Sequence, residues 1–122
     1  MVNANRWYFQ KTADIVNEFR LQVDPLHPQG LPLLNRTIIP MVTEVAEPAH
    51  SRQGHAAIIF GGGGLGMQGG QYQSVTGIHN RLWVTIAQAY LGDNWQSLAA
   101  SESYVKQGAI PIPGLWDPSN LH

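Results

Sequence analysis

The sequence predicts a small α/β fold in which a mixed or parallel sheet is flanked by helices. Two apolar runs, residues 37–45 and 56–60, have the nearly continuous hydrophobic character of strands that are covered on both faces. Two longer segments, residues 5–23 and 79–91, repeat apolar side chains at helical spacing on either side of these runs. Since the chain has 122 residues, we expect a single domain or an incomplete portion of a larger α/β protein.

Residues 5–23 are expected to form a helix with one apolar face, and Asn3 or Asn5 is a suitable cap at its start. The side chains of this face recur at intervals of three and four residues. They are Tyr8, Thr12, Ile15, Phe19 and Val23, with Val16 beside them. Because one helix cannot bury such a face by itself, we expect it to lie against a sheet. Three prolines and a glycine then make residues 24–36 a connector, in which His27 is interpreted as a loop histidine.

Residues 37–45 are the first predicted strand, with an apolar run from Ile38 to Val42. Pro40 lacks a backbone N–H, which argues against a central antiparallel position, or for a bulge or strand start at that point. The second predicted strand, residues 56–60, ends in four glycines, and a weaker third strand is predicted for residues 71–75. A polar segment that contains two histidines connects the first two strands.

The second predicted helix, residues 79–91, has clear signals at both ends. Thr76 or Asn80 opens it, and Gly92 is expected to close it in the left-handed conformation that is typical of a C-cap. For His79, at the start of this helix, we favour a capping role over a role in binding a ligand.

Residues 95–122 are expected to be an extended C-terminal tail, with a further short helix over residues 95–105 as the alternative for its first part. Prolines and glycines predict no regular element towards the end of the chain. We therefore expect the tail to wrap a surface or to reach a partner.

Charged side chains are scarce: they make up 12% of the sequence, about half the usual share in a globular chain. The four tryptophans are spread along the chain, and aromatic side chains are enriched at protein interfaces. Both observations predict a stable complex, with another protein chain or by self-association, or excision from a larger protein. A monomer with few charges is the alternative. The net charge of −1 and the scattered Lys and Arg residues leave no electrostatic footprint for nucleic acid.

The sequence also lacks the features of a membrane span, of an export signal and of cysteine-based sites. No apolar run approaches the roughly 20 residues that span a bilayer, so we expect no membrane span. The first ten residues have no apolar signal core, so we expect no export signal on this chain. Because there are no cysteines, disulfides and thiolate metal ligands are excluded.

The glycine-rich stretch after the second strand contains the pattern G-x-G-x-x-G at residues 64–69. A dinucleotide site would also need this pattern to open a helix and to precede an acidic residue by about 20 positions. The residues that follow do not start a helix, and the next acidic residue is the distant Asp93. We therefore favour a turn whose glycines allow positive φ. Close backbone approach to a ligand or to a neighbouring chain is the alternative.

Acidic and imidazole side chains gather in the polar segment between the first two strands. They are Glu44, Glu47, His50 and His55. Loops at strand ends are where α/β folds place their chemistry, and carboxylate and imidazole groups bind zinc, manganese or iron. The spacing matches no compact motif such as H-E-x-x-H, so on spacing alone solvated loop residues are the default interpretation and a metal site is the alternative.

The order of these segments resembles the C-terminal part of a family of exported bacterial proteins of unknown function, which are related to the sulfatase and alkaline-phosphatase-like superfamily. The matching pieces are the strand end VTEV, the loop histidine His55, the strand IIFGGGG, the turn Gly69-Gly70 and the helix from Leu82 to Gly92. The resemblance covers residues 5–94, and the order of the pieces carries it rather than any single motif.

This resemblance implies an α/β sandwich of the phosphatase type and a divalent metal, zinc or similar, that assists the hydrolysis of phosphate or sulfate esters. By position, Glu44 and His55 match residues on the metal side, and His50 is a weaker match. The nucleophile and the other ligands of the superfamily belong to a preceding half. We therefore expect a C-terminal portion or small subunit that a partner chain completes, in a protein of the periplasm or cell surface. The alternative is a non-enzymatic structural subunit that self-associates.

Overall fold

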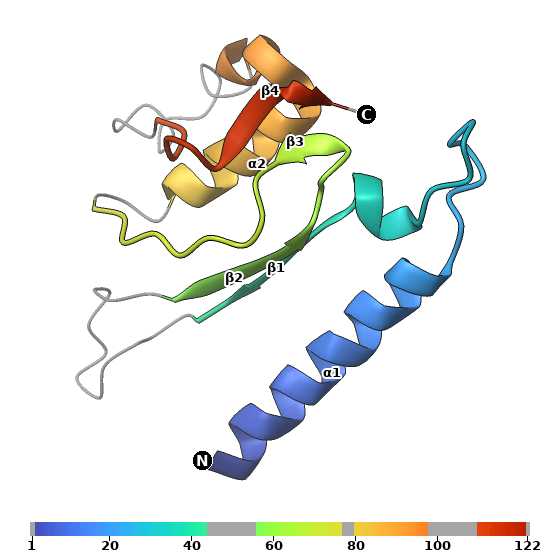
Figure 1. Cartoon of the computed structure of the whole chain (residues 1–122). Coiled ribbons are helices and arrows are strands. Elements are labelled where there is room, and N and C mark those ends of the chain that lie inside the picture. Colours follow the sequence, from blue (N-terminus) through green and yellow to red (C-terminus); the bar gives the residue numbers. More distant parts are fainter. Residues whose placement is uncertain (1, 44–55, 77–79, 98–109, 122) are drawn as a thin grey trace. The chain divides into compact units, whose positions relative to one another are not determined.

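The computed structural model describes residues 2–43, 56–76, 80–97 and 110–121. The chain divides into two compact units, residues 1–61 and 62–122 (Figure 1). Within the described residues there are two α-helices and two antiparallel two-stranded sheets. The prediction of a mixed α/β fold is therefore confirmed. The prediction of a mixed or parallel sheet is wrong for this part of the chain, because both strand pairs run antiparallel.

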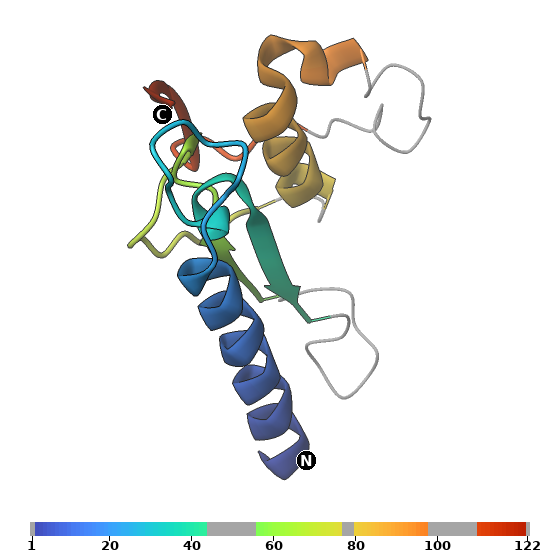
Figure 2. The same ribbon diagram turned by 90° about the vertical axis from the view of Figure 1, so that its right-hand side faces the viewer.

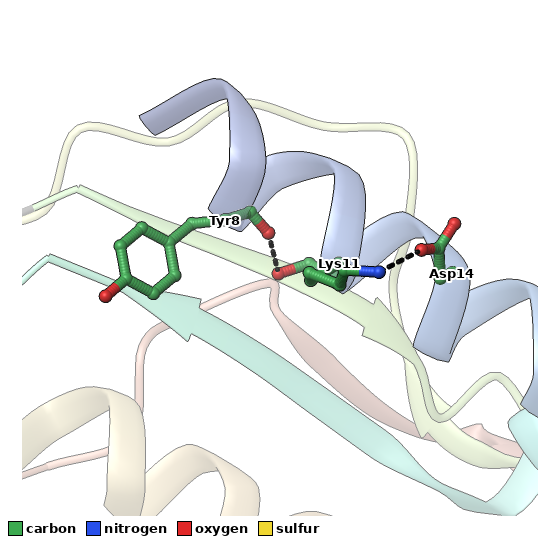
Figure 3. Close-up of polar contacts among 4 residues, drawn as sticks. Tyr8, Lys11 and Asp14 are labelled. Carbon is green, nitrogen blue, oxygen red and sulfur yellow. Dashed lines mark hydrogen bonds and ion pairs between the residues drawn. The ribbon is translucent and has the colours of Figure 1, made fainter. Parts of the chain in front are cut away.

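The first unit begins with helix α1, Val2–Leu21, which confirms the helix predicted over residues 5–23. No proline or glycine interrupts the segment, and the helix ends shortly before Pro25, because proline cannot continue a helix. On its surface the Lys11 ammonium lies 3.4 Å from the Asp14 carboxylate, one turn further along (Figure 3). Such an exposed ion pair stabilises a helix by only about 0.2–0.5 kcal/mol.

The apolar face predicted for α1 is only partly covered. Tyr8 is 60% exposed and Ile15 is 51% exposed, whereas Thr12 and Phe19 are half-buried. The Thr12 hydroxyl donates to the Tyr8 carbonyl at 2.9 Å, so this contact also stays within the helix (Figure 3). The expected burial of the whole face is therefore not seen.

Strands β1 (Ile38–Val42) and β2 (Ala57–Gly61) form an antiparallel ribbon in the first unit. This confirms the first two predicted strands, the first at a shorter length and the second shifted by one residue. A short 3-10 helix, η1 (Leu33–Arg36), leads into β1, and α1 lies beside the ribbon (Figure 2). Pro40 lies opposite Ile59 in the register. Neither strand of a two-stranded ribbon is central, which is why β1 tolerates a proline.

In the second unit, strand β3 (Leu65–Met67) pairs antiparallel with β4 (Trp116–Leu121), and helix α2 (Asn80–Leu91) lies against both strands. The helix confirms the one predicted over residues 79–91. Its end is followed by η2 (Gly92–Asn94), in which Gly92 has a φ of 57°, and this confirms the left-handed C-cap. Among the described residues of this unit, the buried side chains are Met67, Leu82, Val84, Thr85, Ala89 and Ile112.

Two further predictions differ from the structure. No strand forms at residues 71–75; the glycine-rich stretch contains β3 instead. The end of the chain, predicted to hold no regular element, contains β4. A three-residue strand with a central glycine has almost no local signal, because its stability depends on a partner strand about fifty residues away in the sequence. Residues 95–97 are helical, and most of the short helix proposed for 95–105 lies outside the described residues.

Candidate functional site

The predicted metal ligands lie outside the described part of the chain, in the segment 44–55. They are Glu44, His50 and His55. The structure does describe the two residues to which this segment is attached. The Thr43 amide donates to the Ala56 carbonyl at 3.0 Å, and the Ala56 amide donates to the Thr43 hydroxyl oxygen at 3.0 Å. The two ends of the segment are therefore attached to a hydrogen-bonded pair at the end of the β1–β2 ribbon.

Across the described ranges, no three His, Asp or Glu side chains are grouped as a metal ion would need. His27 lies in a turn, where its Nδ1 accepts the Gln29 amide at 3.2 Å and its own amide donates to the Asp24 carbonyl at 3.1 Å. These local contacts confirm the interpretation of His27 as a loop histidine. His79, for which a capping role is predicted, lies outside the described residues.

Two glycines of the glycine-rich stretch, Gly61 and Gly66, are required by contacts within their own units. Gly61 has a φ of 79°, and a Cβ at this position would collide with the Thr37 carbonyl oxygen. Gly66 has a φ of 83°, and a Cβ there would lie 2.5 Å from the Asp117 carbonyl oxygen of β4. The prediction of glycines with positive φ is therefore confirmed. The backbone that closely approaches Gly61 and Gly66 belongs to this same chain. Because Leu65 begins a strand rather than a helix, the stretch lacks the context of a dinucleotide site.

An open cleft of about 370 Å³ lies between α1 and the β1–β2 ribbon in the first unit. Phe9 and Val16 of the helix form one wall, and Met41 and Phe60 of the ribbon form the other. Arg20 also lines the cleft, and its guanidinium donates to the Asn17 side-chain oxygen at 2.9 Å. Folded interiors leave few voids larger than a water molecule. The helix and the ribbon alone therefore do not make a closed core.

In the second unit, buried polar contacts hold the segment before β4 against α2. Thr85 is 0% exposed, and its hydroxyl accepts the Ile112 amide at 2.8 Å while it donates to the Arg81 carbonyl at 2.7 Å. The Arg81 guanidinium donates to three backbone carbonyls, those of Thr76, Ile110 and Pro111. These contacts satisfy backbone groups that a proline-containing segment cannot pair in a sheet.

Two further side-chain hydrogen bonds join the glycine-rich side of this unit to the C-terminal segment, one donated from each side. The Trp116 indole N–H donates to the Leu65 carbonyl at 2.8 Å, and the Gln71 amide donates to the Gly114 carbonyl at 2.9 Å. Sequence reasoning does not identify these residues, since the acceptors are backbone carbonyls more than forty positions away. Their role is to keep the end of the chain on its own unit.

Asp117 is the described group whose acidity the structure clearly changes. Its carboxylate accepts the Ser119 hydroxyl at 2.7 Å and the Ser119 amide at 2.9 Å. These bonds stabilise the charged form, so the pKa of Asp117 lies below its ordinary value. This arrangement is a local turn on an exposed strand, and it favours a permanent carboxylate rather than a proton donor.

No family model, no curated protein and no solved structure matches this chain. Neither described α-helix combines the length and the apolar character that crossing a bilayer takes. The uncovered helix, the open cleft and the chemistry of the segment 44–55 are therefore the features on which a function is proposed.

Proposed function

We propose that this chain is the C-terminal portion, or a small subunit, of a phosphatase- or sulfatase-like α/β protein whose fold another chain or a second copy completes. The observation that carries the proposal is the uncovered apolar surface of α1. Trp7, Tyr8 and Ile15 are each more than half exposed, although a helix of a soluble domain normally buries its apolar side. Exposed apolar surface of this kind marks an interaction site.

The cleft beside α1 supports the same proposal. Its walls are apolar side chains from the helix and from the ribbon, yet it remains open to solvent. An isolated two-stranded ribbon is at best marginally stable, and three or more strands with a packed face are needed for independent stability. Further strands from a second chain would supply what the first unit lacks.

The activity proposed for the completed assembly is metal-assisted hydrolysis of a phosphate or sulfate ester. Glu44, His50 and His55 provide one carboxylate and two imidazoles, which is the donor set of a well-known class of catalytic zinc sites. When bound, a zinc or similar ion supplies Lewis-acid stabilisation of the ester oxygen. The proposed task of these three residues is to bind and orient that ion, and the nucleophile is supplied by another chain of the assembly.

A non-enzymatic structural subunit that self-associates is the second candidate, and the uncovered surface of α1 supports it equally. The glycine-rich stretch adds no support, because Gly61 and Gly66 are required by contacts inside their own units. The two candidates differ in whether a metal is bound.

Native mass spectrometry combined with metal analysis tests the proposal. We expect a particle heavier than one 13.4 kDa chain, with one divalent metal ion for each chain. Glu44→Ala and His55→Ala should each remove the metal, whereas Glu47→Ala and His27→Ala serve as matched controls and should retain it. With the metal bound, the completed assembly should hydrolyse p-nitrophenyl phosphate or p-nitrophenyl sulfate.

The other outcomes separate the candidates. A metal-free oligomer that cleaves neither ester would support the structural subunit. A metal-free monomer would contradict both candidates, because association is common to them.

A further inference from the structure

The register of the β1–β2 ribbon determines which backbone groups of β2 bond to β1. Thr43 and Ala56 continue that register, and the Thr43 amide donates to the Ala56 carbonyl at 3.0 Å. In an antiparallel pair, opposite residues alternate between hydrogen-bonded and non-hydrogen-bonded positions. Because Ala56 is at a hydrogen-bonded position, every second residue after it is as well. Ile58 and Phe60 are therefore the residues of β2 whose backbone groups bond to β1.

Ala57 and Ile59 occupy the alternate positions, so their N–H and C=O groups point away from β1 to the outer edge of β2. Among the described residues, neither makes a backbone hydrogen bond outside the ribbon. Ala57 is exposed, and its neighbour Ile58 is 42% exposed. No proline or charged side chain lies between residues 56 and 62. This edge therefore lacks the prolines and charged side chains by which many proteins discourage strand addition.

The outer edge of β1 is different. Pro40 lies opposite Ile59, at a non-hydrogen-bonded position, so the missing N–H of the proline is on the outer side of β1. A proline at this place costs the ribbon no hydrogen bond and interrupts any strand that would pair there. Among the described residues, the β2 edge is therefore better suited to a further strand than the β1 edge.

The β2 edge is complementary to itself. When two copies of β2 run antiparallel about a two-fold axis at Ile59, Ala57 of one copy faces Gly61 of the other, and Ile58 faces Phe60. The outward-pointing backbone N–H and C=O groups of one copy then lie opposite those of the other copy, in hydrogen-bonding positions. Because the strand carries no charge, no like charges face each other across the axis. A two-fold axis also closes the assembly at two chains.

We propose that two copies of this chain associate through the outer edges of β2, which forms a four-stranded antiparallel sheet in the order β1–β2–β2–β1. This inference rests on the proposed association and specifies its partner and its register. On one face of the new sheet, Met41 and Ile58 of one copy continue into Phe60 and Ile39 of the other. Since Met41 and Phe60 line the cleft beside α1, the second copy extends the apolar wall of that cleft.

Cysteine cross-linking tests the register, because the chain has no cysteine of its own. In the proposed sheet the two Ile59 Cα atoms lie about 5.5 Å apart, within the range of roughly 4.4–6.8 Å that a disulfide spans. The two Ala57 Cα atoms are offset by four residues, which is about 13 Å. Under mild oxidation, Ile59→Cys should form a disulfide-linked dimer, and Ala57→Cys, the matched control, should form at least tenfold less.

Amide hydrogen exchange tests the same register without introducing a cysteine. The Ile59 amide should be protected in the associated protein and should lose its protection on dilution, while the Ile58 amide, bonded to β1, stays protected. Equal cross-linking of both variants, or an unprotected Ile59 amide in an oligomer, would overturn the β2 edge and leave the proposed association standing. A monomer in native mass spectrometry would overturn both the proposed association and the β2–β2 pairing. A different polypeptide cross-linked at Ile59 would overturn the proposal that the partner is a second copy of this chain.

Discussion

Replacing Thr85 by valine tests how the C-terminal segment is held to its unit. Thr85 is fully buried, and its hydroxyl is the acceptor for the Ile112 amide at 2.8 Å. Valine has nearly the same shape, so the replacement removes the hydroxyl and preserves the packing volume. The Arg81 carbonyl, which also accepts this hydroxyl, keeps the backbone amide bond that an α-helix provides. The principal loss is therefore the partner of one buried N–H group.

The magnitude follows from two opposing contributions. A buried N–H without a partner lowers the free energy of unfolding by about 1–3 kcal/mol. The additional methyl group of valine restores about 0.8 kcal/mol through burial. We therefore expect Thr85→Val to destabilise the second unit by about 0.2–2 kcal/mol, with the centre of the range at about 1 kcal/mol. Since about 1.4 kcal/mol corresponds to a factor of ten in an equilibrium constant, exchange of the Ile112 amide should accelerate about fivefold.

Hydrogen exchange at the Ile112 amide, together with urea denaturation, measures this effect. Thr12→Val is the matched control, because the Thr12 hydroxyl also donates to the carbonyl four residues earlier, at 2.9 Å, on the half-exposed surface of α1. That variant should change stability by less than about 0.5 kcal/mol. The reasoning would be refuted by wild-type exchange at Ile112 in Thr85→Val, or by equal destabilisation in the two variants.

Two further predictions concern β3 and β4. Gly66→Ala should destabilise the strand pair by more than about 1 kcal/mol, because Gly66 has a φ of 83° and the new Cβ would lie 2.5 Å from the Asp117 carbonyl oxygen. The matched control is Gly69→Ala, where a Cβ meets nothing within 4 Å; equal urea midpoints would contradict this account. Ser119→Ala should raise the pKa of Asp117 towards its ordinary value, because the hydroxyl bond at 2.7 Å is lost. Since the folded pKa lies below the unfolded one, the wild-type carboxylate stabilises the fold above the unfolded pKa and loses this contribution as the pH falls through the folded pKa. An NMR titration that gives the same Asp117 pKa in both proteins would show that the hydroxyl is not the cause.

The elements that the sequence predicts well are those with strong local signals. The helix 80–91 has an apolar side at helical spacing and ends at Gly92, whose left-handed conformation the structure confirms. The strands over 38–42 and 57–61 are short apolar runs bounded by turn-forming residues. In each case the residues that specify the element lie within it or next to it.

Strand direction is not predicted, because it depends on the connection rather than on the strand. Apolar residues on both faces are typical of a covered parallel strand, and β1 and β2 have this pattern. They nevertheless pair antiparallel. One apolar face lines the cleft beside α1, and the apolar pattern carries no information about strand direction.

The candidate site is predictable only to the level of residue type. The segment 44–55 contains the carboxylate and imidazole groups that bind zinc, and the structure describes the Thr43–Ala56 pair at its base without describing the segment. The contacts of Thr85 and Arg81 are not predictable for a different reason. Their partners are backbone groups 27 to 30 positions away, and a backbone amide has no residue type that a sequence pattern could reveal.

Pro40 shows how register converts a weak sequence signal into a structural constraint. In the sequence this proline argues against a central antiparallel position, or for a bulge or strand start. Its position opposite Ile59 places the missing N–H on the outer edge of β1, so we expect a strand that extends this sheet to add at β2. The expectation applies to a second copy and to a different partner chain alike, because it depends on the backbone of the ribbon alone. A partner strand found on the outer edge of β1 would contradict this expectation, whatever the identity of the partner.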